Sequence, residues 1–407
     1  MTEYEGWKEV WRSWYPIAEG VFYFCQGFYL TGMFMYLSVF MINVFKLPFD
    51  FVAMLNSVLT LPIYLKMFPM AFCDKFPVGR YGRRRPYIMM AAITYAICYG
   101  ILSTIMEFSS IWVAMIIISM LAWVIADGNL DALTIDVTPP EKYGLMQGVA
   151  WGCRGLGAAL GGIAFALMAA KMNWSIIVAL IGVFAVIECL SGILMREPKI
   201  TKERLASIQA FKKVAKKRET WSGALYLLLA SAGTATFGPL GSSYFVAQAR
   251  IDQTTLGITL SILNTGMFIG SFVAGVLSDR IGTKKALIVG NILAIIACGL
   301  LATIAPGNLS YLFTVAFLVG AFQGAQMTSM LRMYMELSPP EIGGALFATY
   351  ASIANAGMVL VGGLTISFFT PIVGQAYSMI SVVPYVIVAS MMLPFMKLYE
   401  PRKAKGT

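Results

Sequence analysis

The sequence contains no histidine, which excludes imidazole as a general base, a proton relay or a metal ligand. Charged residues make up only 12% of the 407 residues, well below the roughly one quarter found in soluble globular proteins. The six cysteines are scattered without a CxxC pair, so they indicate packing residues and neither a zinc site nor a disulfide framework. A P-loop motif for ATP binding is also absent, which argues against a primary pump.

Hydrophobic residues account for 58% of the chain and form runs long enough to cross a bilayer, which takes about 20 residues. We predict an all-α membrane protein with twelve transmembrane helices, at residues 17–44, 52–73, 87–106, 110–136, 143–170, 174–194, 221–248, 254–278, 285–305, 308–336, 343–370 and 374–396. The formal charge of +10 does not indicate nucleic-acid binding, because the basic residues lie in short loops between these runs.

The basic residues are concentrated in alternate loops, which is a topology signal. The opposite loops contain only Lys46, Lys171 and Arg250, so both termini are expected in the cytoplasm. The first residues have no basic segment of the kind that opens a signal peptide, so none is expected. The connector 195–220 carries nine Lys and Arg against three Glu, and it is predicted to form a basic amphipathic helix between six-span halves at 1–194 and 221–407.

The two halves repeat each other at an offset of 200 positions. Asp136 corresponds to Glu336, and the pair Pro139-Pro140 corresponds to Pro339-Pro340. The loops after the second and eighth spans also match, since each has an aspartate, then a glycine, then a basic cluster. These loops run from Asp74 through Gly82 to Arg85, and from Asp279 through Gly282 to Lys285. Two parallel six-span repeats predict a transporter with its site near mid-membrane, between the repeats.

This repeated aspartate–glycine–basic loop resembles that of the major facilitator superfamily, and the resemblance covers the whole chain. Further residues of the first half resemble the branch that groups muropeptide permeases, acetyl-CoA transporters and folate–biopterin transporters: Pro62, Lys66, Asp74, Gly82-Arg-Arg-Arg-Pro-Tyr87, Asp127, Asp131 and Arg154. The run from Gly82 to Tyr87 is also similar to sugar–cation symporters. The resemblance implies two six-helix bundles that expose a central site to each side of the membrane in turn.

In the superfamily, the repeated loop residues hold the inward face shut, and the resemblance implies the same role here. The candidate gating residues are Asp74, Gly82, Arg83, Arg84, Arg85, Asp136, Asp279, Arg280, Lys284 and Glu336. An aspartate in this position can accept hydrogen bonds at the N-terminus of a neighbouring helix. The alternative is a positive loop with surface ion pairs, each worth about 0–1 kcal/mol. Arg332 lies one turn before Glu336, which predicts an ion pair between them.

Three charges inside the first half, Asp127, Asp131 and Arg154, have no charged counterpart in the second half. Their equivalents at the offset of 200 are Met327, Leu331 and Ala354. A charge at mid-membrane costs about 2.5–3.5 kcal/mol and usually pairs or lines a cavity. Helical rise brings all three to a similar depth, so Arg154 is the expected partner of the aspartates. One arginine cannot neutralise two carboxylates, which favours proton coupling or solute binding, and the alternative is a static ion pair.

Lys66, Gln26 and Tyr29 complete the predicted substrate and coupling site. For Lys66 the alternative is that its side chain extends to the cytoplasmic interface. We predict a monomeric secondary transporter in the membrane that moves a small organic solute, anionic or amphipathic, with protons or else sodium. No cofactor or metal is expected, and no nucleophile–base motif indicates an enzyme. The alternatives are a sugar–cation symporter and an exporter of drugs or metabolites from the same superfamily.

Overall fold

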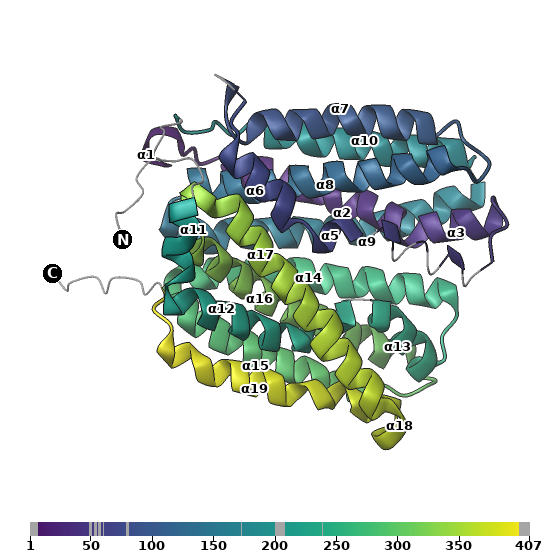
Figure 1. Cartoon of the computed structure of the whole chain (residues 1–407). Coiled ribbons are helices and arrows are strands. Elements are labelled where there is room, and N and C mark those ends of the chain that lie inside the picture. Colours follow the sequence, from purple (N-terminus) through teal and green to yellow (C-terminus); the bar gives the residue numbers. More distant parts are fainter. Residues whose placement is uncertain are drawn as a thin grey trace. The chain divides into compact units, whose positions relative to one another are not determined.

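A computed structural model describes residues 7–48, 51–52, 55, 58–59, 61–78, 81–171, 173–199, 208–237 and 239–398. All regular elements in these residues are helices (Figure 1). Among the described residues, seven helical segments are long and apolar enough to cross a membrane by length and composition alone. The apolar runs predict helices correctly because a backbone in lipid must satisfy its own hydrogen bonds.

The first sequence half contains four uninterrupted long helices and two segments with breaks. The long helices are α7 (Arg85–Leu102), α8 (Ser110–Val137), α9 (Tyr143–Lys171) and α10 (Trp174–Gly192). The first predicted span is α2 (Tyr15–Thr31), a π-helical stretch (Gly32–Tyr36) and α3 (Leu37–Asn43). The second predicted span contains α5 (Leu61–Tyr64) and α6 (Met67–Lys75), and several of its earlier residues lie outside the described ones. The short helix α1 (Trp7–Val10) precedes them all.

The second half also combines long helices with shorter ones. Its long helices are α14 (Gln253–Ile281), α15 (Thr283–Ala302) and α16 (Leu309–Leu337). The remaining helices are α12 (Arg218–Ala230), α13 (Pro239–Ala249), α17 (Gly343–Ala356), α18 (Leu364–Ser378) and α19 (Val383–Met392). Gly374 has a φ of 82° and interrupts α18, where the eleventh and twelfth spans were predicted to separate. The basic connector contains helix α11 (Ile208–Ala215), while Leu205, part of its predicted apolar face, lies outside the described residues.

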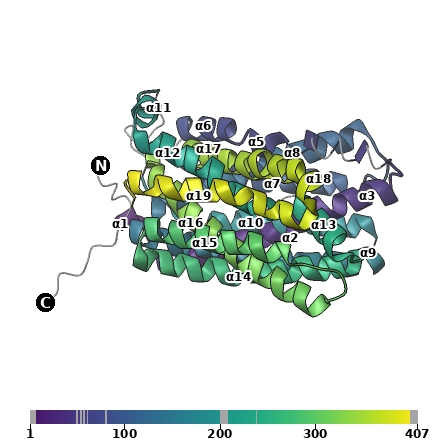
Figure 2. The same cartoon turned by 90° about the horizontal axis from the view of Figure 1, so that it is seen from below.

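The chain folds into two compact units, each of which includes a piece of the other sequence half. The first unit comprises residues 1–137, 156–207 and 340–352, and the second comprises 138–155, 208–339 and 353–407. In the first unit, α7 packs against α8 and α10, and α10 packs against α2. In the second unit, α14 and α15 both pack against α16 (Figure 2). The first turns of α9 and α17 are the exchanged pieces.

Glycines let α9 approach its neighbours closely in both units. A Cβ at Gly148 would lie 2.8 Å from the carbonyl oxygen of Ser271 on α14. A Cβ at Gly161 would lie 2.7 Å from the carbonyl oxygen of Phe28 on α2. Small residues that permit such close helix contact are typical of membrane proteins. The glycines of α9 are therefore packing residues.

Candidate functional site

A buried cluster of three charged side chains lies in the first unit. The Lys66 ammonium is 2.5 Å from a carboxylate oxygen of Asp127 and 3.0 Å from one of Asp131. The side chains of Lys66, Asp127 and Asp131 are only 9%, 11% and 6% exposed. The two aspartates are four residues apart on α8 and therefore share one helix face. One ammonium faces two carboxylates, so the three side chains together carry one excess negative charge if both carboxylates are ionised.

The local backbone explains how Lys66 reaches α8. Lys66 lies in the break between α5 and α6, and Pro62 and Pro69 flank this break. A proline has no N–H and disturbs the helix around it. On the facing helix, a Cβ at Gly128 would lie 3.0 Å from Cε of Lys66. The broken helix and the missing side chain together let the ammonium meet both aspartates.

Neutral polar groups extend the cluster. The Tyr23 hydroxyl donates to Asp131 at 2.5 Å. The side-chain amide of Gln26 donates to both Asp127 and Glu188, at 2.9 Å each. These bonds connect α2, α8 and α10 through buried side chains. Each carboxylate of α8 thus receives a neutral donor besides Lys66, and such donors lower the cost of burying a charge.

The structure brings together Lys66, Gln26, Asp127 and Asp131, four of the six residues predicted for the site. Tyr29 instead exchanges a hydrogen bond with Tyr95 at 3.2 Å.

The expected pairing of Arg154 with the aspartates is wrong, because Lys66 is the cation bonded to both of them. Arg154 belongs to the second unit, where its guanidinium lies 5.0 Å from the ring centre of Trp151. Helical rise predicts the depth of a residue, whereas the direction of its side chain depends on the packing of the helix.

Tyr23 was not predicted from the sequence, and Glu188 was given no role. A signal for Tyr23 was present, since Glu19, Tyr23 and Gln26 recur at spacings of four and three in an apolar run. That spacing places the three side chains on one helix face. In the structure all three are buried, and Glu19 accepts a hydrogen bond from Thr134 at 3.1 Å.

Four of the candidate gating residues of the first unit form a second buried cluster. Arg84 pairs with Asp74, and its Nε lies 3.5 Å from a carboxylate oxygen of Asp136. Arg83 also pairs with Asp136, at 3.1 Å. The other carboxylate oxygen of Asp74 accepts the N–H of Ala345, at the start of α17, at 2.7 Å. The aspartate therefore caps a helix N-terminus, as the repeated loop predicted.

The second unit contains the equivalent arrangement. Asp279 accepts the N–H groups of Gly144 and Leu145, at the start of α9, at 2.9 and 2.8 Å. Arg332 pairs with Asp279, and its predicted pair with Glu336 is confirmed at 3.3 Å. The cation comes from helix α16 here, whereas the first unit uses the arginines of its loop.

Three charged residues among the predicted gating residues lie outside these clusters. Arg280 is exposed and Lys284 is partly exposed, and neither has an ion pair within the part of the chain that the structure describes. Arg85 donates from Nε to the carbonyl oxygen of Ile193, at 2.8 Å, beside the end of α10. The basic residues of the repeated loops therefore differ in what they contact.

Gly82 and Glu197 shape the loop that carries the arginines of the first unit. One carboxylate oxygen of Glu197 accepts the N–H groups of Arg83 and Arg84, at 2.7 and 2.8 Å. Gly82 has a φ of 124°, which is left-handed backbone that favours glycine, and a Cβ there would collide with the Glu197 carboxylate. The sequence analysis did not identify Glu197, because nothing in its spacing connects it to this loop.

Glu197→Ala is expected to reduce the free energy of unfolding by about 1–3 kcal/mol, because two backbone donors lose their acceptor. Thermal unfolding in detergent measures the change, and Glu107→Gln at an exposed loop carboxylate is the control. An unfolding temperature unchanged from the wild type would show that water replaces the carboxylate at no cost.

The carboxyl of Glu197 is also expected to make the stability of the folded protein depend on pH. Burial raises the pKa of Glu197, against the opposing effect of the N–H donors of Arg84 and Arg83. A raised folded-state pKa means that the folded protein binds this proton more tightly than the unfolded chain does. The stabilising contribution is therefore present at acid pH and decreases as pH rises from about 4.5 through the raised pKa. The unfolding temperature of the wild type, relative to Glu197→Gln, is expected to fall over that interval.

Comparison with known proteins identifies the family of the chain. Residues 223–407 match the family model described as Major Facilitator Superfamily, and residues 26–216 match the BT1 family, which is the folate–biopterin transporter family. The two matches together cover most of the chain and support its assignment to the major facilitator superfamily. The chain has the all-α fold of that superfamily and is a multi-pass membrane protein. The predicted superfamily and fold class are confirmed.

Solved structures with a similar fold include two transporters. The Escherichia coli fucose:proton symporter FucP is 12% identical, with a TM-score of 0.71 over 94% of this chain and 98% of that chain. The human organic anion transporter MFSD10 is 13% identical, with a TM-score of 0.72 over 93% of this chain and 98% of that chain. At these identities the likeness concerns the fold alone.

Curated relatives match a shorter stretch. Facilitated glucose transporter member 4 of solute carrier family 2 from Homo sapiens is 36% identical over 97 residues, which are 23% of this chain and 19% of the relative. The Sus scrofa protein of the same name is 36% identical over 97 residues, which are 23% of this chain and 55% of that relative. The match thus spans about a fifth of the human protein's length.

Proposed function

We propose that this protein is a secondary active transporter that moves a small organic solute across the membrane by alternating access. The observation that carries this proposal is the buried cluster of Lys66, Asp127 and Asp131. Membership of the major facilitator superfamily supports the transport function. Intramembrane charges are costly, and the repeat-related positions Met327 and Leu331 carry none, so the fold alone does not account for the two aspartates.

The charge balance of the cluster suggests how a proton could couple to the solute. With both carboxylates ionised, the cluster has one excess negative charge, and a proton on Asp127 or Asp131 removes it. The protonated carboxyl holds the ammonium of Lys66 less strongly, because the Coulomb attraction of one partner is lost. Lys66 can then bind an anionic group of the solute. Sodium is the alternative coupling ion, since it can also neutralise a carboxylate.

Lys66 and the family match both support a proposal for the solute class. A buried ammonium favours an anionic or amphipathic organic solute, and the BT1 match over residues 26–216 is in accord with this. The distribution of basic loop residues supports cytoplasmic termini. We expect the Asp74 and Asp279 clusters to act as a latch that opens and re-forms in each transport cycle, in a monomer.

Asp131→Asn is expected to abolish proton-driven accumulation of the solute in proteoliposomes, while solute exchange is retained. An amide of similar shape keeps a partner for Tyr23 but cannot take up a proton. Exposed Glu107→Gln is the matched control and is expected to accumulate solute like the wild type. Accumulation by Asp131→Asn at the wild-type level would contradict proton coupling through this carboxylate.

A thermal-shift screen identifies the solute for that assay. The panel contains folates, pterins, muropeptide fragments, coenzyme A esters and simple sugars. A ligand at about 100 times its dissociation constant stabilises the folded state by about 2.7 kcal/mol. An anionic compound that stabilises the wild type and fails to stabilise Lys66→Gln supports the proposed site. Arg154→Ala, measured in parallel, tests whether Arg154 also contributes to solute binding.

Sugar–cation symport is the second candidate function. The 97-residue match to facilitated glucose transporters and the fold likeness to a fucose:proton symporter favour it. A simple sugar as the only stabilising compound, with binding unaffected by Lys66→Gln, would favour this candidate over an anionic solute.

A further inference from the structure

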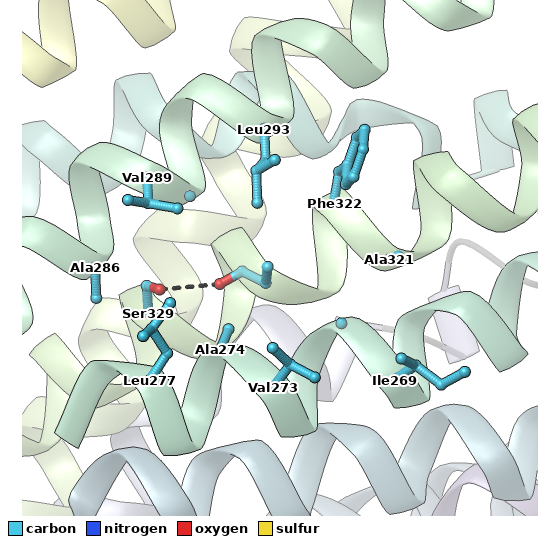
Figure 3. Close-up of a pocket in the computed structure, with 13 residues that line it drawn as sticks. Ile269, Val273, Ala274, Leu277, Ala286, Val289, Leu293, Ala321, Phe322 and Ser329 are labelled. Carbon is cyan, nitrogen blue, oxygen red and sulfur yellow. Dashed lines mark hydrogen bonds between the residues drawn. The ribbon is translucent and has the colours of Figure 1, made fainter. Parts of the chain in front are cut away.

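A groove opens on the surface of the second unit between α14 and α15, and α16 forms its floor (Figure 3). Its volume is about 220 Å³. Val273 and Leu277 of α14 are 56% and 39% exposed, and Val289 of α15 is 39% exposed. In a membrane protein, apolar side chains exposed along a transmembrane helix face the acyl chains of the lipid.

Small residues keep the groove open. Ala274, Ala286, Gly290 and Ala325 line it, and a Cβ at Gly290 would lie 2.9 Å from the Cα of Gln326. The only hydroxyl drawn in Figure 3 is that of Ser329, which donates to the carbonyl oxygen of Ala325 at 2.9 Å. The donor at the floor is therefore satisfied, which makes the groove suitable for a hydrocarbon chain.

The groove extends from Leu277 to Ile269 on α14, which corresponds to about 12 Å along the helix axis. One end of the groove lies near Gly282, the residue between the end of α14 and the start of α15. Arg280 follows Leu277 by three residues, and Lys285 precedes Val289 by four, so each cation shares a helix face with a groove residue.

Both cations are exposed and available for an anion. Neither Arg280 nor Lys285 has an ion pair among the residues that the structure describes. The nearby carboxylate of Asp279 is engaged by Arg332 and by the N–H groups of Gly144 and Leu145. The apolar groove therefore ends beside two cations at the turn between α14 and α15, and basic residues that flank transmembrane helices lie at the level of the lipid headgroups.

We propose that this groove binds an anionic glycerophospholipid, with one acyl chain between α14 and α15 and the phosphate at Arg280 and Lys285. An arginine forms bidentate bonds with phosphate oxygens, and a lysine adds a second charge. This assignment gives Arg280 a role other than the gating one expected from its sequence position. The site is separate from the cluster of Lys66, Asp127 and Asp131 and does not depend on the solute.

The test is a lipid titration of the delipidated full-length protein, followed by native mass spectrometry and thermal unfolding. Phosphatidylglycerol is expected to bind at least about tenfold more tightly than phosphatidylcholine, because two cations near the surface each favour an anionic lipid. Arg280→Gln combined with Lys285→Gln is expected to remove this preference. Lys212→Gln combined with Lys213→Gln removes two exposed charges from α11 and is expected to preserve it.

A second variant tests the acyl chain. Ala274→Leu fills the groove and is expected to weaken binding of both lipids while the two cations remain. If that variant cannot be purified, Val289→Trp covers the exposed rim and serves the same purpose.

Three results would overturn the proposal. The first is that the Lys212→Gln, Lys213→Gln control loses its preference for phosphatidylglycerol to the same extent, which would indicate non-specific attraction to the surface. The second is wild-type lipid binding by the variant with a filled or covered groove. The third is stabilisation by glycerol phosphate as strong as that by phosphatidylglycerol, which would identify a site for free phosphate.

Discussion

Lys66→Met is expected to lower the free energy of unfolding by about 3–5 kcal/mol, because it leaves Asp127 and Asp131 buried together without their cation. Methionine keeps an unbranched side chain of similar length, so the lost charge accounts for most of the effect. The change is measured by thermal unfolding in detergent. Transport is expected to be lost as well, since the proposed anion-binding group is removed.

A combined variant separates charge from packing. Replacement of Lys66 by Met together with Asp127→Asn and Asp131→Asn removes all three charges at once. Replacing a complete buried ion cluster with neutral groups is often neutral or stabilising. We therefore expect this variant to regain the lost stability but to remain inactive.

Lys75→Met, at an exposed position of α6, is the matched control for the lost lysine and is expected to change little. Wild-type stability of Lys66→Met alone would contradict the charge assignment, because it would mean that the aspartates do not need the ammonium.

Asp74→Asn is expected to increase the labelling rate of Cys73 by a maleimide about 10- to 100-fold. Asp74 pairs with Arg84 and accepts the N–H of Ala345, so its neutralisation weakens bonds that hold the start of α17. Hydrogen bonds to charged groups contribute about 1.5–3 kcal/mol, and each 1.4 kcal/mol corresponds to a tenfold change in population. Cys73 is 1% exposed and packs in a cluster with Ala348 of α17, so it reports the opening of this contact.

The labelling experiment requires a background in which the other cysteines are alanine, namely Cys25, Cys98, Cys153, Cys189 and Cys298. A parallel background that retains only Cys298, buried in the second unit, reports global unfolding. Its labelling rate is expected to stay the same in Asp74→Asn. Equal increases at both cysteines, or no increase at Cys73, would show that Asp74 is not a latch residue.

Much of the local structure and part of the site could be predicted from the sequence. The apolar runs predicted helices, because a chain in lipid has few other ways to satisfy its backbone. The repeated aspartate–glycine–basic loop paired Asp74 with Asp279, and in the structure both accept N–H groups at helix N-termini. The four-residue spacing of Asp127 and Asp131 placed them on one face of α8, where both meet Lys66. These results follow from periodicity and repetition alone.

The tertiary structure decided which side chains meet. The sequence indicated Arg154 as the partner of the aspartates, whereas the break around Lys66 and the space at Gly128 bring Lys66 to them. Arg332, assigned from sequence only to Glu336, also pairs with Asp279 from another helix. Sequence spacing determines the depth and the face of a residue on its own helix. The rotation of that helix, and the neighbour that its face meets, are set by packing between helices that lie far apart in the chain.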